Sequence, residues 1–148
     1  RELPRLAGLI DRVVDAHGEN HPELREVREV CAALQCELLS HMLKEEQVLF
    51  PMVRQLERTP PDERRGLRFH CGSIGNPIAM MEHEHDSVGK ALRQLAHLTQ
   101  NYRPPADACA TYRALLSGLA ELQGDLHRHI HKENNILFPA AAVLGPRT

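Results

Sequence analysis

The sequence has 148 residues, a formal net charge of −2 with histidine neutral, and a hydrophobic content of 42%. This length suits one core, and we expect residues 1–148 to form a single domain. The balanced charge excludes a basic surface for nucleic acid, and no apolar run is long enough to cross a bilayer. Charged residues interrupt the first apolar runs, unlike a signal peptide, so we expect a cytoplasmic protein that binds neither nucleic acid nor membrane.

Four stretches of the sequence have helical periodicity, and segments rich in proline and glycine separate them. These stretches are residues 2–16, 22–57, 77–100 and 105–144. Pro22, Pro77 and Pro105 stand where a proline of the first helical turn would stand. No segment alternates polar and apolar residues over the length of a strand. The sequence therefore predicts an all-α fold, an up-down four-helix bundle.

Each predicted helix has one apolar stripe, which we follow in alternating steps of three and four residues. The stripe of residues 22–57 ends with Val48 and Met52, and that of residues 105–144 ends with Ile136 and Ala140. All four stripes are apolar except at six positions. These positions are His17, His41, Glu45, His85, His129 and Glu133.

Two of these helices carry nearly the same phrase, "HMLKEEQVLFP" from His41 and "HIHKENNILFP" from His129. In each phrase a histidine and a glutamate lie one helical turn apart on the stripe. Burying such groups without partners costs on the order of several kcal/mol each. A metal centre would satisfy them together, because paired carboxylates can bridge two ions while histidines fill terminal positions. These donors suit iron or manganese, and also zinc.

Simpler explanations remain open for parts of this pattern. A single His–Glu pair is more often a structural ion pair, and a mononuclear zinc site would leave one carboxylate over. A duplicated structural helix would explain the repeat, but not the stripe histidines on the other two helices. The cysteines form no CxxC pair and do not predict a thiolate site. The histidines outside the stripes are expected to be solvated or only near the site; they are His21, His70, His83, His97, His127 and His131.

The two phrases, together with "NPIAMMEHEHD" between them, resemble the hemerythrin-like HHE domain over nearly the whole chain. The similarity is greatest to the iron–sulfur cluster repair (RIC, YtfE/ScdA-type) branch. This resemblance implies a hemerythrin-like four-helix bundle with two non-haem iron ions, for which zinc or manganese could substitute. It makes Glu45 and Glu133 the bridging ligands and places Glu84 close to the metals without binding them. The histidine ligands that it implies are His17, His41, His85 and His129.

The function that the resemblance implies is the repair of iron centres damaged by nitrosative or oxidative stress. The protein would donate iron to iron–sulfur proteins, reduce nitric oxide at the di-iron site, or both. The alternative is a module that binds or senses dioxygen, nitric oxide or iron without turnover, and a third is a metal-free structural bundle. In the family another histidine ligand precedes the position of Leu3, so we expect the start of the first helix to be missing. The family's N-terminal domain with a Cys-Cys pair is also absent from the sequence.

Overall fold

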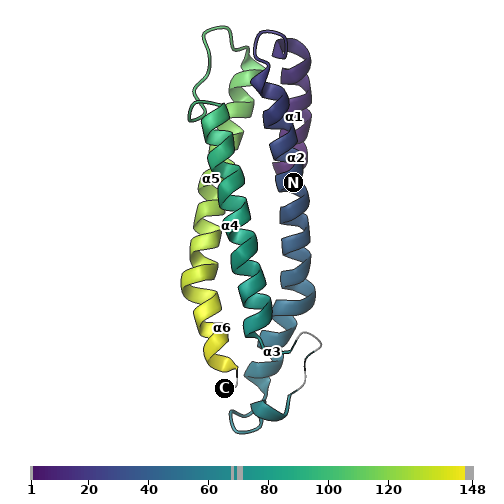
Figure 1. The fold of residues 1–148 in the computed structure, drawn as a ribbon, viewed down its shortest axis with the longest axis vertical. Coiled ribbons are helices and arrows are strands. Elements are labelled where there is room, and N and C mark those ends of the chain that lie inside the picture. Colours follow the sequence, from purple (N-terminus) through teal and green to yellow (C-terminus); the bar gives the residue numbers. More distant parts are fainter. Residues whose placement is uncertain (1, 68, 70–71, 146–148) are drawn as a thin grey trace. The chain divides into compact units, whose positions relative to one another are not determined.

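The computed structural model describes residues 2–67, 69 and 72–145 (Figure 1). His70 and Cys71 therefore lie outside the described residues. The described ranges contain helices and turns but no strand, which confirms the all-α prediction. None of the helices within these ranges is both long and apolar enough to cross a membrane.

Four continuous helical stretches make up most of the described chain. The first is α1, and a wide π-helical turn joins α2 to α3 and α5 to α6 without a break. The bounds are α1 Glu2–His17, α2 Glu23–Lys44, η1 Glu45–Leu49, α3 Phe50–Arg58, α4 Gly75–Leu98, α5 Ala110–Lys132, η3 Glu133–Leu137 and α6 Phe138–Leu144. The short 3₁₀ turn η2, Arg64–Gly66, lies in the link after α3. The last stretch begins at Ala110 rather than residue 105, because the preceding segment forms a turn in which the amide of Ala108 donates to the carbonyl of Pro105.

The chain divides into two compact units, and three of the four helical stretches contribute to both. Unit 1 comprises residues 1–37 and 87–127, and unit 2 comprises residues 38–86 and 128–148. Unit 1 contains α1, the first part of α2, the second part of α4 and the first part of α5. Leucine, isoleucine and valine fill this core; its members include Leu6, Ile10, Val13, Leu24, Val27, Leu34, Leu92, Leu95, Leu115 and Leu119.

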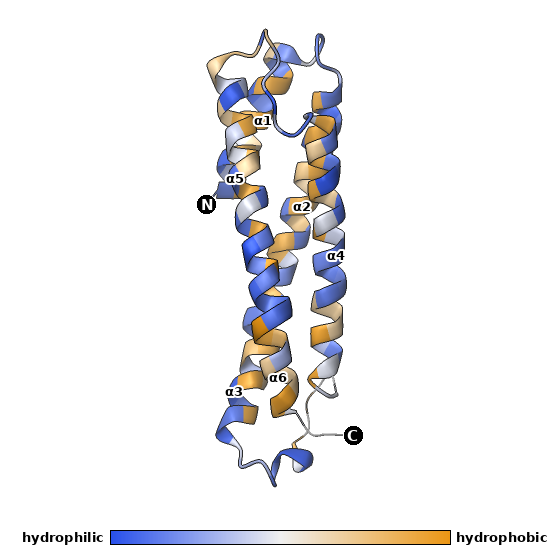
Figure 2. Cartoon of the chain, turned by 90° about the vertical axis from the view of Figure 1, so that its left-hand side faces the viewer, coloured by the Kyte–Doolittle hydropathy of each residue, from blue (hydrophilic) through white to orange (hydrophobic). Residues whose placement is uncertain are grey.

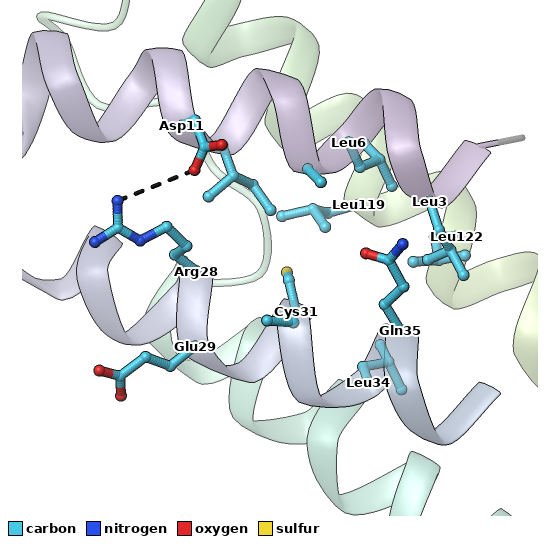
Figure 3. Close-up of a pocket in the computed structure, with 13 residues that line it drawn as sticks. Leu3, Leu6, Asp11, Arg28, Glu29, Cys31, Leu34, Gln35, Leu119 and Leu122 are labelled. Carbon is cyan, nitrogen blue, oxygen red and sulfur yellow. Dashed lines mark ion pairs between the residues drawn. The ribbon is translucent and has the colours of Figure 1, made fainter. Parts of the chain in front are cut away.

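Unit 1 also contains an apolar cavity of about 400 Å³, lined from α1, α2 and α5 (Figure 3). The sulfur of Cys31 points toward Leu119 inside it, and an ion pair between Arg28 and Asp11 spans 4.0 Å at its edge. Burial raises the pKa of Cys31 to about 12, so this side chain remains a neutral thiol near pH 7.

The core of unit 2 lies beyond the two π-helical turns. Figure 2 shows hydrophobic segments on α3 and α6, which contact each other. The buried side chains of this core come from η1, α3, the start of α4, the residue before it and α6; they are Leu49, Met52, Leu56, Ile74, Ile78, Met81, Phe138 and Ala141.

Each π-helical turn precedes a proline, and the proline explains why the helix widens there. Pro51 and Pro139 have no N–H to donate, and their rings would clash with the carbonyl four residues earlier in a regular α-helix. The helix instead closes a wider ring, in which the amide of Phe50 donates to the carbonyl of Glu45. The amide of Phe138 donates to the carbonyl of Glu133 in the same way. In both turns the hydrogen bond thus spans five residues instead of four, so the residues that follow are shifted by one position relative to a regular α-helix.

The added residue corrects the stripe predicted beyond each glutamate. Met52 is buried, as predicted, but Val48 is only partly buried, whereas Leu49 is fully buried. Ile136, predicted to lie in the core, is 66% exposed, and Ala140 is also exposed. The core positions are instead taken by Phe138 and Ala141. The prediction failed here because a stripe read at a constant α-helical period does not allow for a π-helical turn.

This correction predicts opposite results for two substitutions in the second phrase. Phe138→Ala should lower the free energy of unfolding by about 3–5 kcal/mol, because it empties a buried position. Ile136→Ala should change that free energy by less than about 0.5 kcal/mol, because the side chain lies at the surface. Urea unfolding of both variants measures the difference. A larger loss for Ile136→Ala would show that the regular α-helical stripe continues through the phrase.

Candidate metal centre

Five of the six predicted site residues lie together in unit 2. His41 and Glu45 come from the end of α2 and the start of η1, and His129 and Glu133 come from the corresponding ends of α5 and η3. One ligand atom from each of these four residues lies within 4.8 Å of the others. His85 of α4 approaches the same group, with its Nε2 atom 3.6 Å from Glu133 Oε2.

The imidazoles and carboxylates of the two phrases face one another in a crossed arrangement. His41 Nε2 lies 3.0 Å from Oε1 of its own Glu45 and 3.7 Å from Oε1 of Glu133. His129 Nε2 contacts Oε1 of its own Glu133 and lies 3.8 Å from Oε1 of Glu45. The Nε2 atoms of His41 and His129 thus each lie close to carboxylate oxygens of both glutamates. We call His41, Glu45, His85, His129 and Glu133 the cage.

The cage buries two carboxylates that lack adequate partners. Glu45 and Glu133 are only 6% and 5% exposed, and His41 and His85 are each 4% exposed. Glu45 Oε1 and both oxygens of Glu133 accept no hydrogen bond from the part of the chain that is described. Buried carboxylate oxygens require a cation or a donor, because water no longer solvates them. The orphaned oxygens and the nitrogen donors around them therefore fit a bound metal ion.

Glu84 and Asn134, which lie outside the cage, form hydrogen bonds with the Nδ1 atoms of its two buried histidines. Glu84 Oε2 lies 2.9 Å from Nδ1 of His41, and the other oxygen of Glu84 contacts Nζ of Lys44. Asn134 Oδ1 lies 2.8 Å from Nδ1 of His85. Both contacts leave the Nε2 atoms facing the cage, as metal-binding histidines require. Sequence reasoning placed Glu84 near the centre but missed Asn134, whose only signal was its position directly after Glu133.

Charge in the cage shifts the pKa of His41, His129 and Glu133 toward their ionised forms. Burial opposes ionisation of His41, but the carboxylates of Glu133, Glu45 and Glu84 outweigh it and raise its pKa to about 10. Glu133 and Glu45 likewise raise the pKa of His129 to about 10. Burial alone would raise the pKa of Glu133, yet the neighbouring imidazoles hold it well below its usual range. The cage therefore attracts positive charge.

His129 differs from the other cage histidines because it lies at an open edge. Its side chain is 53% exposed, although its Nε2 atom faces both glutamates. The off-stripe histidines His83, His97, His127 and His131 are exposed, as predicted. His131 contacts the amide of Asn135 rather than the cage. His129 is thus the cage histidine most accessible to solvent.

His17, the sixth predicted site residue, belongs to unit 1 at the end of α1. Its ring lies 5.1 Å from the ring of Tyr112, edge to face, and 6.3 Å from that of His21. His21 Nε2 in turn lies 2.9 Å from Asp107 Oδ1, an ion-pair partner that sequence reasoning did not foresee. The role of His17 as a metal ligand stays a prediction.

Comparison with known proteins agrees with this geometry. The hemerythrin HHE cation binding domain matches residues 1–141, and the chain therefore belongs to the hemerythrin family. Over 140 residues it is 42% identical to the iron-sulfur cluster repair protein YtfE of Yersinia pseudotuberculosis serotype IB (strain PB1/+). The proteins of the same name from Yersinia pestis and Enterobacter sp. (strain 638) are 42% and 41% identical.

Each of these alignments covers 95% of the present chain and 58% of the relative. The chain thus spans less than two thirds of the length of the curated relatives that it matches. The resemblance to the hemerythrin HHE family and to its iron–sulfur cluster repair branch is confirmed.

The pKa shifts predict how the stability of the metal-free protein changes with pH. The raised pKa of His41 and His129 adds stability that is complete below their ordinary pKa of 6.5 and is lost as the pH rises toward about 10. The lowered pKa of Glu133 adds stability that is present above its ordinary pKa of 4.5 and is lost as the pH falls below it. Urea unfolding with a chelator should therefore give the highest free energy of unfolding between pH 4.5 and pH 6.5.

The double variant His41→Gln, His129→Gln provides the control for this profile. It lacks both raised pKa values, so its free energy of unfolding should decline less between pH 6.5 and pH 10. An equally steep decline in the variant would show that other groups cause the loss of stability.

Proposed function

We propose that the cage holds two iron ions bridged by the carboxylates of Glu45 and Glu133. In this proposal His41, His85 and His129 are terminal ligands through their Nε2 atoms. The observation that carries the proposal is the pair of buried glutamates, whose orphaned oxygens face three imidazoles. Bridging carboxylates with terminal histidines are a known solution for di-iron sites in helical bundles. Manganese or zinc could occupy the same nitrogen and oxygen donors.

Bound iron would supply redox chemistry and positions at which a small gaseous ligand could coordinate. The protein itself contributes the charge, the orientation and the surroundings of the site. Glu45 and Glu133 supply the negative charge that retains cations. Glu84 holds Nδ1 of His41, and Lys44 in turn contacts Glu84. Phe138 covers one face of His85, with the two rings stacked 5.5 Å apart. These contacts keep the donors aimed inward before a metal arrives.

The activity that we propose is repair of iron–sulfur centres damaged by nitrosative or oxidative stress. Support comes from the relatives, which are named iron-sulfur cluster repair proteins, and from the cage itself. The site would act by donating iron to damaged iron–sulfur proteins, by reducing nitric oxide, or by both. Iron–sulfur proteins are the partners that this function requires.

A second candidate is a module that binds dioxygen, nitric oxide or iron without turnover. The exposure of His129 favours it, because this histidine places one edge of the cage at the protein surface, where a small ligand could approach. Such a module would need the same cage but no route for electrons to the metals.

Metal content tests the proposed ligands. Protein produced in iron-replete medium should contain about two iron ions per chain, as the bridged site requires. Glu45→Ala and Glu133→Ala should each lose iron, because either change removes a bridging carboxylate. His127→Ala and His131→Ala are the matched controls and should retain it, because both side chains are exposed and neither belongs to the cage.

Two results would contradict this assignment. One is a wild-type protein that is fully folded without metal after growth in iron-replete medium. The other is loss of iron in His127→Ala or His131→Ala together with retention in His129→Ala.

The products formed from nitric oxide distinguish the two candidate functions. Under anaerobic conditions with a chemical reductant, the iron-loaded protein should convert nitric oxide to nitrous oxide over several turnovers, measured in the headspace by gas chromatography. Reversible binding of dioxygen without release of nitrous oxide would instead identify a binding module. Glu133→Ala, in which the bridge is removed, controls for the reaction of the reductant alone.

A further inference from the structure

The hydrogen bond between His85 and Asn134 determines which nitrogen of His85 faces the cage. Asn134 Oδ1 lies 2.8 Å from His85 Nδ1, and an amide oxygen can only accept a hydrogen bond. Nδ1 therefore carries a proton, and in the neutral form of the ring the lone pair of His85 is on Nε2. That atom lies 3.6 Å from Glu133 Oε2 and 3.2 Å from His41 Nε2. The tautomer fixed by Asn134 is the one in which His85 can bind a metal.

Asn134 lies at the start of the second π-helical turn. Asn134 is the second residue of η3 and is partly buried, whereas its neighbour Asn135 is exposed and bonds to His131. The corresponding residue of the first phrase, Glu46, is exposed. The two copies of the repeated phrase are thus alike in their His and Glu residues but differ at the next position.

The two buried histidines consequently have outer partners of different charge. His41 donates from Nδ1 to the carboxylate of Glu84, which comes from α4. His85 donates from Nδ1 to the neutral amide of Asn134, which comes from η3. A carboxylate partner strengthens an imidazole as a metal donor more than an amide does, because its negative charge polarises the ring.

We propose that Asn134 is a positioning residue that selects the metal-binding tautomer of His85, and that its neutral oxygen makes His85 a weaker donor than His41. The inference about donor strength rests on the proposed metal site, whereas the tautomer is a property of the metal-free protein. His85 would therefore hold a bound metal ion less strongly than His41 would.

Three substitutions separate the parts of this proposal. Asn134→Leu removes the acceptor while keeping a side chain branched at Cγ, and Asn134→Asp keeps an oxygen acceptor but adds charge. Asn135→Leu, which changes the same residue type one position further on at the surface, is the matched control. Asn134→Ala serves as a second acceptor-free variant if the leucine cannot be accommodated.

Nitrogen NMR of histidine-labelled, metal-free protein measures the tautomer directly, with His85→Gln to assign the signals. Wild-type protein, Asn134→Asp and Asn135→Leu should show His85 protonated at Nδ1. The acceptor-free variants should show a mixture of tautomers or protonation at Nε2. An unchanged tautomer in both acceptor-free variants would overturn the proposal.

Competition with an iron chelator measures the consequence for the metal. Asn134→Leu should retain iron about 10–100-fold less well than wild type, while Asn134→Asp should retain it and lower the reduction potential of the site. A loss in Asn134→Asp equal to that in Asn134→Leu would show that shape, not the acceptor, matters, and would overturn the role of Asn134. Absence of metal from the wild-type protein would refute the proposed function, and the NMR result would still decide the tautomer.

Discussion

The structure of unit 2 depends on the burial of Glu45 and Glu133 against three imidazoles. A carboxylate that is about 95% shielded from water is unstable unless positive charge compensates it, and the compensation in the metal-free protein comes from His41 and His129. No hydrogen bond within the described chain satisfies Glu45 Oε1 or either oxygen of Glu133. The carboxylates form ion pairs with the imidazoles, and a bound metal cation would satisfy the remaining acceptor positions.

The prolines that follow the glutamates connect this site to the core beneath it. Because Pro51 and Pro139 cannot continue a regular α-helix, each helix widens from the glutamate onward. The wide turns let Leu49 and Phe138 reach the apolar core while the glutamates still face the cage. Phe138 joins the two regions, since it is buried in that core and stacks on His85. The repeated phrase thus specifies a ligand pair and the packing that supports it.

Sequence periodicity predicted the all-α fold and the inward orientation of His41, Glu45, His85 and Glu133, because all four lie on stripes of regular helix. It failed at Ile136 and Ala140, which follow a π-helical turn that no constant period represents. Asn134 was missed because it lies off the stripe, beside Glu133, and its contact with His85 joins residues 49 positions apart. The ion pair of His21 with Asp107 joins residues 86 positions apart, a distance over which periodicity carries no information.

In the metal-free protein, protons on His41 and His129 supply the positive charge that a bound metal ion would otherwise supply. The carboxylates raise the pKa of His41 and His129 to about 10, so both rings are cationic at neutral pH in the metal-free protein. Metal binding must therefore displace protons from the same Nε2 atoms that become ligands. The carboxylates of Glu45 and Glu133 attract protons onto the histidines in the metal-free protein and would attract metal ions in the loaded one. The protonated histidines therefore stabilise the two buried glutamates before a metal arrives. The cage is consequently preformed by electrostatics, and the outer contacts of Glu84 and Asn134 determine which nitrogen each buried ring presents.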